Sequence, residues 1–364
     1  MKGNRINKNI AFTGWARGFL SVFLLLSVLL CACGSADSAA SAATPDPQAS
    51  ERSTIYVDSM DTFMELSAFG SNRMTALKAA EKEIQRLNDL LSIGLEDSEI
   101  SRVNRAGRGT VSSDTAAMIR EALILFEETD GAFDLTVYPL MDLWGFVSKE
   151  YHVPTEEELA ETMARVGAER VTLDDASGLV TLDEGQAIDL GGIAKGFTSQ
   201  RLMEVFRENG VESAIVSLGG NIQCLGSKPD GSPWRIGVKD PVNPETGLSA
   251  IVQIVDKAVI TSGGYERFFV DEATGMTYRH IIDPSTGYPA ENGLSSVSIV
   301  TSDGMLGDGL STALYIMGLE KAAEYWRTHS EEFDAILIDN DGKLYVTAGI
   351  ADSVTSDHAI EIIR

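Results

Sequence analysis

Three oxygen-bearing residues late in the chain have the spacing of a metal site. Asp308, Ser311 and Thr312 stand at i, i+3 and i+4, so on a helix that begins at Asp308 their oxygens share one face. A carboxylate, hydroxyls and a nearby backbone carbonyl are hard oxygen ligands, which suit Mg²⁺ held together with substrate phosphates. The alternative is that Asp308 is only the N-cap of this helix, with Ser311 at its third position.

A glycine turn at residues 187–196 could hold the phosphates themselves. An apolar run typical of a β-strand ends in Asp189 and two glycines, and a helical pattern follows from residue 198 to residue 209. Glycines allow a close approach to the backbone, and the start of a helix presents free N–H groups to an anion. Lys195 adds a positive charge, but the spacing fits neither a Walker loop nor the dinucleotide-binding motif. A tight strand-to-helix turn without a ligand is the alternative.

One histidine and one aromatic segment complete the set of candidates. His280 precedes an apolar and turn segment, where a side chain can be held at a cleft, although a structural role is the alternative. The other histidines lie in polar surroundings, namely His152, His329 and His358. Met60 and the segment 131–134 could supply an apolar wall and a hydrogen-bonding group for a ring system. The alternative is that these residues belong to the ordinary core and to a turn.

The N-terminus is typical of an exported lipoprotein. Four basic residues precede an apolar run from residue 19 to residue 30, which is too short to span a membrane. Cys33 then follows a small residue, which predicts a signal peptide over residues 1–33, with acylation of Cys33 and anchoring to the cell membrane outside the cytoplasm. Residues 34–53 read as a flexible tether that leads to the body at 54–364. A plain secreted protein with incidental cysteines is the alternative.

Charge and cysteine content exclude several classes of protein. The 364-residue chain carries a net charge of −25, and the predicted signal peptide holds four of its 29 basic residues and none of its 54 acidic ones. The mature part would therefore be still more acidic, which disfavours nucleic acid as a partner. Only Cys224 follows residue 33, so no disulfide framework exists, and its apolar surroundings favour a buried thiol.

Hydrophobic periodicity predicts an α+β fold with mixed, largely antiparallel sheets and packed helices. Helices are expected over 73–91, from a cap at Ser113 or Asp114 to about 129, from a capping box at 155–158, and over 198–209, 308–317 and 319–328. Strands are expected within 54–69, 171–182 and 213–218, and as a hairpin over 336–346.

Six motifs in order resemble the ApbE family of FAD:protein FMN transferases. The motifs are Gly131-Ala-Phe-Asp-Leu-Thr-Val-Tyr-Pro-Leu with Leu143-Trp-Gly-Phe146, Ile188-Asp-Leu-Gly-Gly-Ile-Ala-Lys-Gly196, Ser217-Leu-Gly-Gly-Asn221, Thr261-Ser-Gly263, His280-Ile-Ile-Asp-Pro-Ser-Thr-Gly287 and Asp308-Gly-Leu-Ser-Thr312. The resemblance covers essentially all of 54–364 and implies a two-lobed, T-fold-like catalytic domain.

The resemblance implies a Mg²⁺-dependent transfer in which a Thr or Ser hydroxyl of a second protein attacks the FMN phosphorus of FAD and AMP leaves. Mg²⁺ would be held by Asp308, Ser311, Thr312 and the backbone oxygen of Gly192. His280 would assist removal of the hydroxyl proton. FAD would contact Asp189, Lys195, Met60, Gly94, Ala132, Phe133, Asp134 and Ile282. The acceptor would carry a segment like Asp-x-x-Ser/Thr-Gly-Ala-Ser/Thr, which this chain lacks.

Three positions depart from the pattern that the resemblance leads us to expect. Asp61 stands where the family usually has glycine, Gly94 where an aromatic residue is common, and Gly309 where alanine is usual. These departures bear on FAD affinity more than on the metal site. Two other functions stay open: a Mg²⁺-dependent FAD pyrophosphatase that yields FMN and AMP, and a flavin-binding lipoprotein without catalysis. The flavin-binding lipoprotein is disfavoured by five retained residues, namely Asp308, Ser311, Thr312, Asp189 and Lys195.

Overall fold

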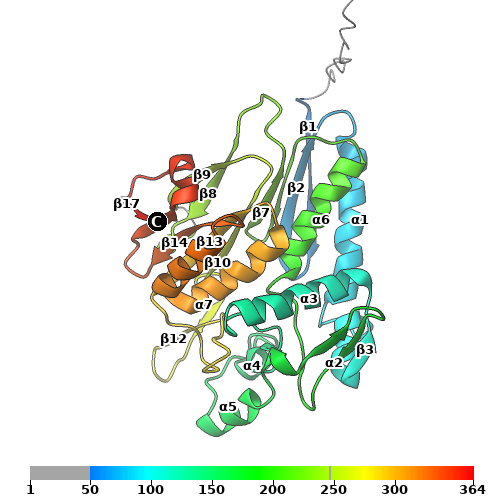
Figure 1. The fold of residues 1–364 in the computed structure, drawn as a ribbon, viewed down its shortest axis with the longest axis vertical. Coiled ribbons are helices and arrows are strands. Elements are labelled where there is room, and N and C mark those ends of the chain that lie inside the picture. The colour runs from blue at the N-terminus through cyan, green and yellow to red at the C-terminus, as the bar shows by residue number, and fades with distance from the viewer. Residues whose placement is uncertain (1–49, 246) are drawn as a thin grey trace, which may run out of the picture. The chain divides into compact units, whose positions relative to one another are not determined.

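A nine-stranded sheet organises the chain, in the order β1-β2-β6-β7-β10-β13-β14-β15-β17 (Figure 1). The structure is a computed structural model that describes residues 50–245 and 247–364. Neighbouring strands run antiparallel, except that β15 and β17 run parallel. The strands are β1 Arg52–Ser59, β2 Thr62–Phe69, β6 Ala214–Leu218, β7 Asn221–Leu225, β10 Ala258–Gly263, β13 Leu294–Thr301, β14 Asp334–Asp339, β15 Leu344–Thr347 and β17 Ile360–Ile363.

Three long helices cover one face of this sheet: α1 (Arg73–Leu91), α6 (Ala194–Glu208) and α7 (Gly304–His329) (Figure 1). Their apolar stripes pack against the inward residues of the strands and form the core. The opposite face is covered by a three-stranded sheet of β8 (Trp234–Lys239), β9 (Leu248–Ile254) and β16 (Val354–Thr355). Cys224 is buried between the two sheets, and burial raises the pKa of its thiol well above the ordinary value.

The segment between α1 and α6 folds into smaller elements at one end of the sheet (Figure 1). Together with two elements that lie further along the chain, it forms a lobe with its own aromatic cluster around Trp144, whose ring lies 5.0 Å from that of Tyr278. The elements are α2 Glu99–Ala106, β3 Arg108–Thr110, α3 Ser113–Glu128, α4 Tyr138–Leu143, α5 Glu156–Met163, η1 Ala168–Arg170, β4 Thr172–Asp174 and β5 Leu179–Thr181, with β11 Phe268–Val270 and β12 Thr277–Arg279; η2 covers Ala348–Ser353.

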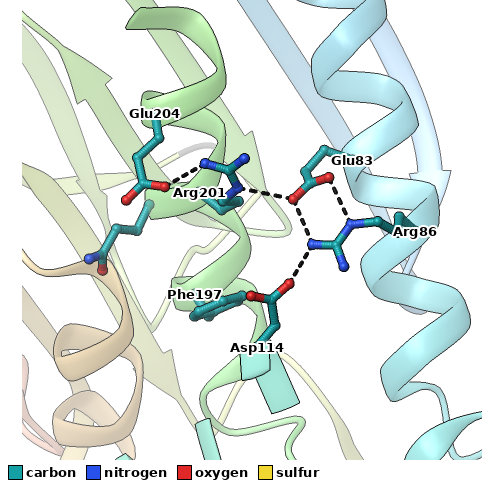
Figure 2. Close-up of a pocket in the computed structure, with 7 residues that line it drawn as sticks. Glu83, Arg86, Asp114, Phe197, Arg201 and Glu204 are labelled. Atoms are coloured by element: carbon teal, nitrogen blue, oxygen red, sulfur yellow. Dashed lines mark hydrogen bonds and ion pairs between the residues drawn. The ribbon is translucent and has the colours of Figure 1, made fainter. Parts of the chain in front are cut away.

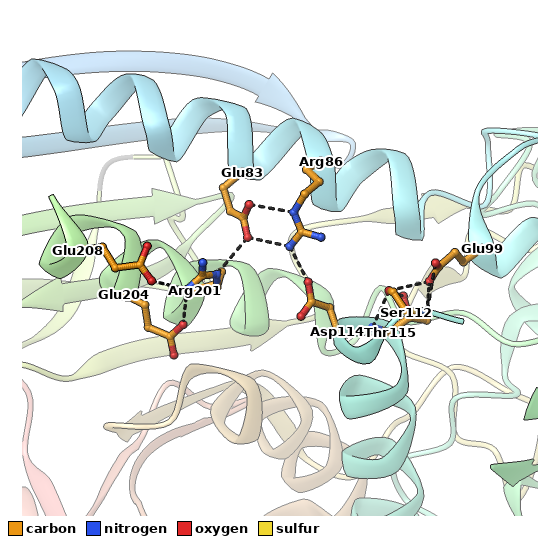
Figure 3. A network of polar contacts seen from close by, with 9 residues as sticks. All are labelled: Glu83, Arg86, Glu99, Ser112, Asp114, Thr115, Arg201, Glu204 and Glu208. Carbon is orange, nitrogen blue, oxygen red and sulfur yellow. Dashed lines mark hydrogen bonds and ion pairs between the residues drawn. The ribbon is translucent and has the colours of Figure 1, made fainter. Parts of the chain in front are cut away.

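A charged network joins α1, α3 and α6 (Figures 2 and 3). The Glu83 carboxylate accepts hydrogen bonds from Arg86 and Arg201, and Arg86 also donates to Asp114. These hydrogen bonds lower the pKa of Glu83, with Arg86 as the main cause. The network lines a hollow of about 430 Å³. Because the arginines that line this hollow are paired with carboxylates of the same chain, we interpret the network as a structural contact that joins α3 and α6 to α1.

Two helices begin earlier than the sequence indicated. Instead of starting at Asp308, α7 starts at Gly304, with the Asp303 carboxylate as its N-cap, and the predicted break between two helices is Gly318, whose φ is 77°. Similarly, α6 starts at Ala194 rather than residue 198. The predicted strand at Ile188 is also wrong, since residues 187–190 belong to no strand or sheet. The predictions for 73–91, 155–158 and the 336–346 hairpin are confirmed.

The predicted signal peptide, Cys33 and most of the tether lie outside the described residues. Among the residues that are described, no helix combines the length and the apolar character that a membrane crossing requires.

Candidate active site

The Asp308 carboxylate is the point at which α6, β7 and α7 meet. Its Oδ2 accepts a hydrogen bond of 2.8 Å from the Gly196 N–H, and its Oδ1 accepts one of 2.8 Å from the Asn221 side-chain amide. Asp308 is only 4% exposed and lies in the second turn of α7, so it is not the helix cap. Two donors, one aimed at each oxygen, fix the orientation of the carboxylate.

Three hydroxyl groups lie together one turn further along α7. Ser262, at the end of β10, lies 2.8 Å from the Ser311 hydroxyl and 3.1 Å from the Thr312 hydroxyl, measured between oxygens. Ser311 also donates to the Asp308 backbone carbonyl at 2.8 Å. The Ser311 and Thr312 hydroxyls therefore both lie at Ser262, a third hydroxyl from β10 to which the sequence had assigned no role.

The glycine turn reaches the same place because two helices approach closely there. A Cβ on Gly196 would lie 2.1 Å from the Gly304 carbonyl oxygen and 2.6 Å from the Asp308 Cβ. The Gly196 N–H is in the first turn of α6, where it has no acceptor within the helix, and it donates to Asp308 instead. Gly192 precedes Ile193, the N-cap residue of α6, so its carbonyl takes no part in the helical hydrogen bonds and is a candidate ligand.

Asp189 and Lys195 form the polar rim of the turn. Asp189 accepts from the Gly191 N–H at 2.9 Å, and the Lys195 ammonium donates to the Gly191 carbonyl at 3.4 Å. Burial raises the pKa of Asp189, while the Gly191 N–H, Lys195 and Arg267 act in the opposite direction. Asp61, Lys195 and Arg267 are therefore near enough to Asp189 for their charges to act on its carboxyl.

His280 lies at this rim with a defined tautomer. Its Nδ1 lies 3.1 Å from the Arg267 carbonyl oxygen, so Nδ1 carries the proton and Nε2 has the free lone pair. Burial lowers the pKa of His280 to about 4, and the positive charges of Arg267 and Lys195 act in the same direction. The hydrogen bond to the Arg267 carbonyl raises the pKa, but by less. The ring is therefore neutral at physiological pH, as a proton acceptor must be.

Comparison with known proteins decides the family. The chain matches the ApbE family over residues 60–337. It is 37% identical over 253 residues to FAD:protein FMN transferase of Vibrio cholerae, covering 67% of this chain and 75% of that protein. It is 30% identical to the Salmonella typhimurium protein of the same name, covering 88% and 93%. The chain belongs to the ApbE family.

Solved ApbE structures share the fold. The ApbE protein of Thermotoga maritima superposes with a TM-score of 0.77 at 31% identity, covering 83% of this chain and 99% of that one. The flavin transferase ApbE of Vibrio cholerae gives 0.74 at 30% identity, with the same coverage. The α+β class with largely antiparallel sheets is confirmed.

The residues that ApbE membership suggests for FAD divide into two groups. Met60 lies in the β1–β2 turn, where its N–H donates to Asn88 and its sulfur is 3.7 Å from the Thr198 hydroxyl. Gly94 is exposed beside a cavity of about 460 Å³ that Tyr138 also lines. A Cβ at Gly94 would meet only the Ser92 hydroxyl, at 3.6 Å, which is an ordinary contact, so the first atom of a side chain fits at this position.

The second group is used internally. Asp134 accepts from the Thr136 N–H at 2.7 Å, from the Thr136 hydroxyl at 2.6 Å and from the Ala168 N–H at 3.2 Å. Ile282 is buried in the aromatic cluster of the lobe, and Ala132 packs on the main core. Phe133 is buried against Gly192, with Cε2 3.0 Å from where a Cβ would stand. Of these residues, Phe133 packs directly against the glycine turn.

The departures from the usual ApbE pattern have structural explanations. Met60 and Asp61 form a two-residue hairpin turn with φ of 51° and 55°, a conformation that aspartate adopts more readily than most residues. A Cβ on Gly309 would lie 2.3 Å from Leu125 Cδ1, so glycine lets α7 approach α3 closely. Asp61 and Gly309 are therefore compatible with an intact site.

The donor set fits Mg²⁺ rather than a metal held wholly by protein. Among the described residues, no group of three or more His, Cys, Asp and Glu side chains could hold a metal. The candidate donors are instead one carboxylate, two helix hydroxyls and the backbone carbonyl of Gly192, all of them oxygens. Mg²⁺ prefers such a site, because it keeps several waters and binds through one or two carboxylates plus substrate phosphates.

Asn104 is a positioning residue that the sequence did not reveal. Its side-chain amide donates to the Ile188 carbonyl and accepts from the Ile188 N–H, both at 2.8 Å. It thereby replaces the neighbouring strand that Ile188 lacks and fixes the backbone just before Asp189. No sequence signal marks it, because its partner lies 84 residues away.

We expect Asn104→Ala to lower the free energy of unfolding by about 1–3 kcal/mol for each Ile188 group left without a partner. Urea denaturation measures this loss. Asn104→Asp keeps an acceptor for the Ile188 N–H but sets a carboxylate oxygen against the Ile188 carbonyl, so this variant should also be less stable than the wild type. An alanine variant as stable as the wild type would contradict the positioning role of Asn104.

Proposed function

We propose that this chain transfers FMN from FAD to a Ser or Thr hydroxyl of an acceptor protein, using Mg²⁺, and releases AMP. The oxygen of the acceptor forms a bond to the FMN phosphorus, and the bond between that phosphorus and the bridging oxygen of AMP breaks. The observation that carries the proposal is the convergence of the glycine turn with Asp308 and the hydroxyls of α7. The names of the ApbE relatives support flavin transfer.

Each residue of the site has a defined task in this reaction. Asp308, Ser311, Thr312 and the Gly192 carbonyl would hold Mg²⁺, which neutralises phosphate oxygens when bound. Lys195 and the N-terminus of α6 offer positive charge to the diphosphate. Nε2 of His280 can take the proton of the incoming hydroxyl, since its Nδ1–H is held by the Arg267 carbonyl.

An acceptor-labelling assay tests the function. The chain is incubated with FAD, Mg²⁺ and a protein that carries an Asp-x-x-Thr-Gly-Ala-Thr segment, and the acceptor is weighed by mass spectrometry. A mass gain of one FMN on the acceptor, with release of AMP, supports transfer. Free FMN with an unmodified acceptor would instead indicate an FAD pyrophosphatase, and neither product would indicate flavin binding alone.

We also propose that Cys33 is acylated and that the body works outside the cytoplasm on a tether. The apolar run, the small residue before Cys33 and the polar residues after it support this assignment. Cys33→Ser should move the protein from the membrane fraction to the soluble fraction of the producing cells.

The lowered pKa of His280 gives a pH prediction. Because His280 stays neutral down to about pH 4 in the free protein, kcat/KM for transfer should show no loss centred on pH 6.5, the ordinary value for histidine. The unfolded chain binds the proton first, so stability should fall as the pH drops from 6.5 towards 4. A histidine-type loss of kcat/KM near pH 6.5 would contradict the buried, neutral His280.

His280→Gln tests the proton-accepting role directly. Loss of a general base costs about 10²–10⁴-fold in rate, so we expect transfer to fall by this factor with little change in FAD binding. His152→Gln is the matched control, since the same substitution at an exposed position should leave the rate unchanged. A His280→Gln variant as active as the control would remove His280 from the mechanism.

A further inference from the structure

The β11–β12 hairpin has both of its ends at the active site. It begins after Arg267 and ends before His280, and the His280 N–H donates to the Arg267 carbonyl at 3.1 Å, which closes its base. The Arg267 guanidinium donates to the Phe146 carbonyl at 2.7 Å and anchors the base to the lobe. Any protein that brings a hydroxyl to His280 must therefore approach beside this hairpin.

The two faces of the hairpin differ in what they contact. On the inner face, Phe269 stacks on Tyr278 at 5.3 Å between ring centroids and packs into the aromatic cluster of the lobe. On the outer face, Phe268 is 51% exposed and Val270 is 52% exposed, and Met276 at the turn is 52% exposed. The turn is held by Asp271, which accepts from the Thr274 N–H at 2.9 Å. The apolar outer face is thus presented by an ordered element.

The hairpin also has free strand edges. Its two strands form a sheet of their own, so among the described residues neither has a second partner strand. An extended segment of another protein can add to such an edge through main-chain hydrogen bonds and place alternate side chains on the outer face.

Charge indicates what this segment carries. Arg279 pairs with Phe268 across the hairpin, and its side chain lies across Gly264, where a Cβ would be 2.2 Å from its Cδ. It lies close enough to Tyr315 for its charge to act on the pKa of that phenol. No carboxylate of the described residues forms an ion pair with Arg279, although the chain carries 54 acidic residues. A carboxylate from outside would complement it.

We propose that the outer face of the β11–β12 hairpin docks the acceptor protein, through an extended segment with an apolar side chain on Phe268 and Val270 and a carboxylate on Arg279. The proposal rests on the proposed function, since it names the partner surface of the same reaction. It places recognition of the acceptor on the element that carries His280, so that binding and alignment of the hydroxyl occur together.

The test compares two hairpin variants, Phe268→Ser and Arg279→Gln, with the control Val255→Ser. The control replaces an apolar side chain that is 49% exposed, in the loop between β9 and β10 and outside the hairpin. The probe is the protein with the Asp-x-x-Thr-Gly-Ala-Thr segment, at saturating FAD. Each hairpin variant should raise the KM for this acceptor at least about tenfold, as loss of one interface anchor does, with the KM for FAD unchanged. The control should behave as wild type, and thermal unfolding should show all three variants folded.

The outcomes separate this inference from the function on which it rests. If the wild type labels the acceptor and both hairpin variants label it equally well, the docking surface is wrong and the transferase function stands. If Arg279→Gln raises the KM for FAD instead, Arg279 contacts a phosphate of FAD and the proposed carboxylate contact is wrong. If the wild type labels no acceptor, the proposed function fails and the docking surface fails with it.

Discussion

Asp308→Asn should abolish flavin transfer, with a loss of about 1,000-fold or more, because it removes the only carboxylate of the proposed Mg²⁺ site and with it several kcal/mol of charge stabilisation. In the wild type, the two oxygens of Asp308 accept hydrogen bonds from the Asn221 amide and the Gly196 N–H. The new asparagine can accept only one of them, because its NH₂ group must face the other donor. The rate of acceptor labelling across a Mg²⁺ titration measures the effect.

Asp303→Asn provides the matched control on the same helix. It makes the same chemical change five residues earlier, at the N-cap of α7, where asparagine caps as well as aspartate. We expect its activity and stability to stay near those of the wild type. Wild-type turnover of Asp308→Asn at saturating Mg²⁺ would refute the metal assignment.

Gly196→Ala should destabilise the protein by about 3 kcal/mol or more, at the upper end of what overpacking usually costs. The added Cβ would stand 2.1 Å from a backbone oxygen, that of Gly304, which cannot rotate away as a side chain can. The start of α6 must then move, and the Gly196 N–H loses its bond to Asp308. Both the unfolding free energy and the labelling rate should therefore fall.

Gly109→Ala, in β3, separates this clash from the general effect of replacing glycine. Its Cβ would meet only the Val103 side chain, at 3.1 Å, which can shift by a few tenths of an ångström. Equal stability of the two alanine variants would show that the α6–α7 crossing tolerates a methyl group, and the role assigned to Gly196 would be wrong.

Sequence periodicity predicted the elements whose stability is local. The stripe of Leu77, Ala80, Ile84 and Leu87 specifies α1, and Thr155 with Glu158 forms the capping box that opens α5. The helix that bears Asp308 was also found, because its three oxygen-bearing residues follow helical spacing. In these cases, residues that are close in sequence determine the structure.

The misplaced boundaries depend on contacts between distant segments. The first turn of α6 contains Gly196, a poor helix former, and it is helical because the Gly196 N–H finds Asp308, 112 residues away. Ile188 resembles a strand, but Asn104 takes the place of its partner. Such pairings leave no periodic trace in a sequence.

The deep burial of Cys224 has a practical consequence for these experiments. A thiol with a raised pKa between two packed sheets forms little thiolate and reacts slowly with maleimides or disulfide reagents. Since residues 54–364 contain no other cysteine, a cysteine introduced at Val270 could carry a fluorophore at a single position. Its emission would then report, in real time, the arrival and departure of a partner at the hairpin.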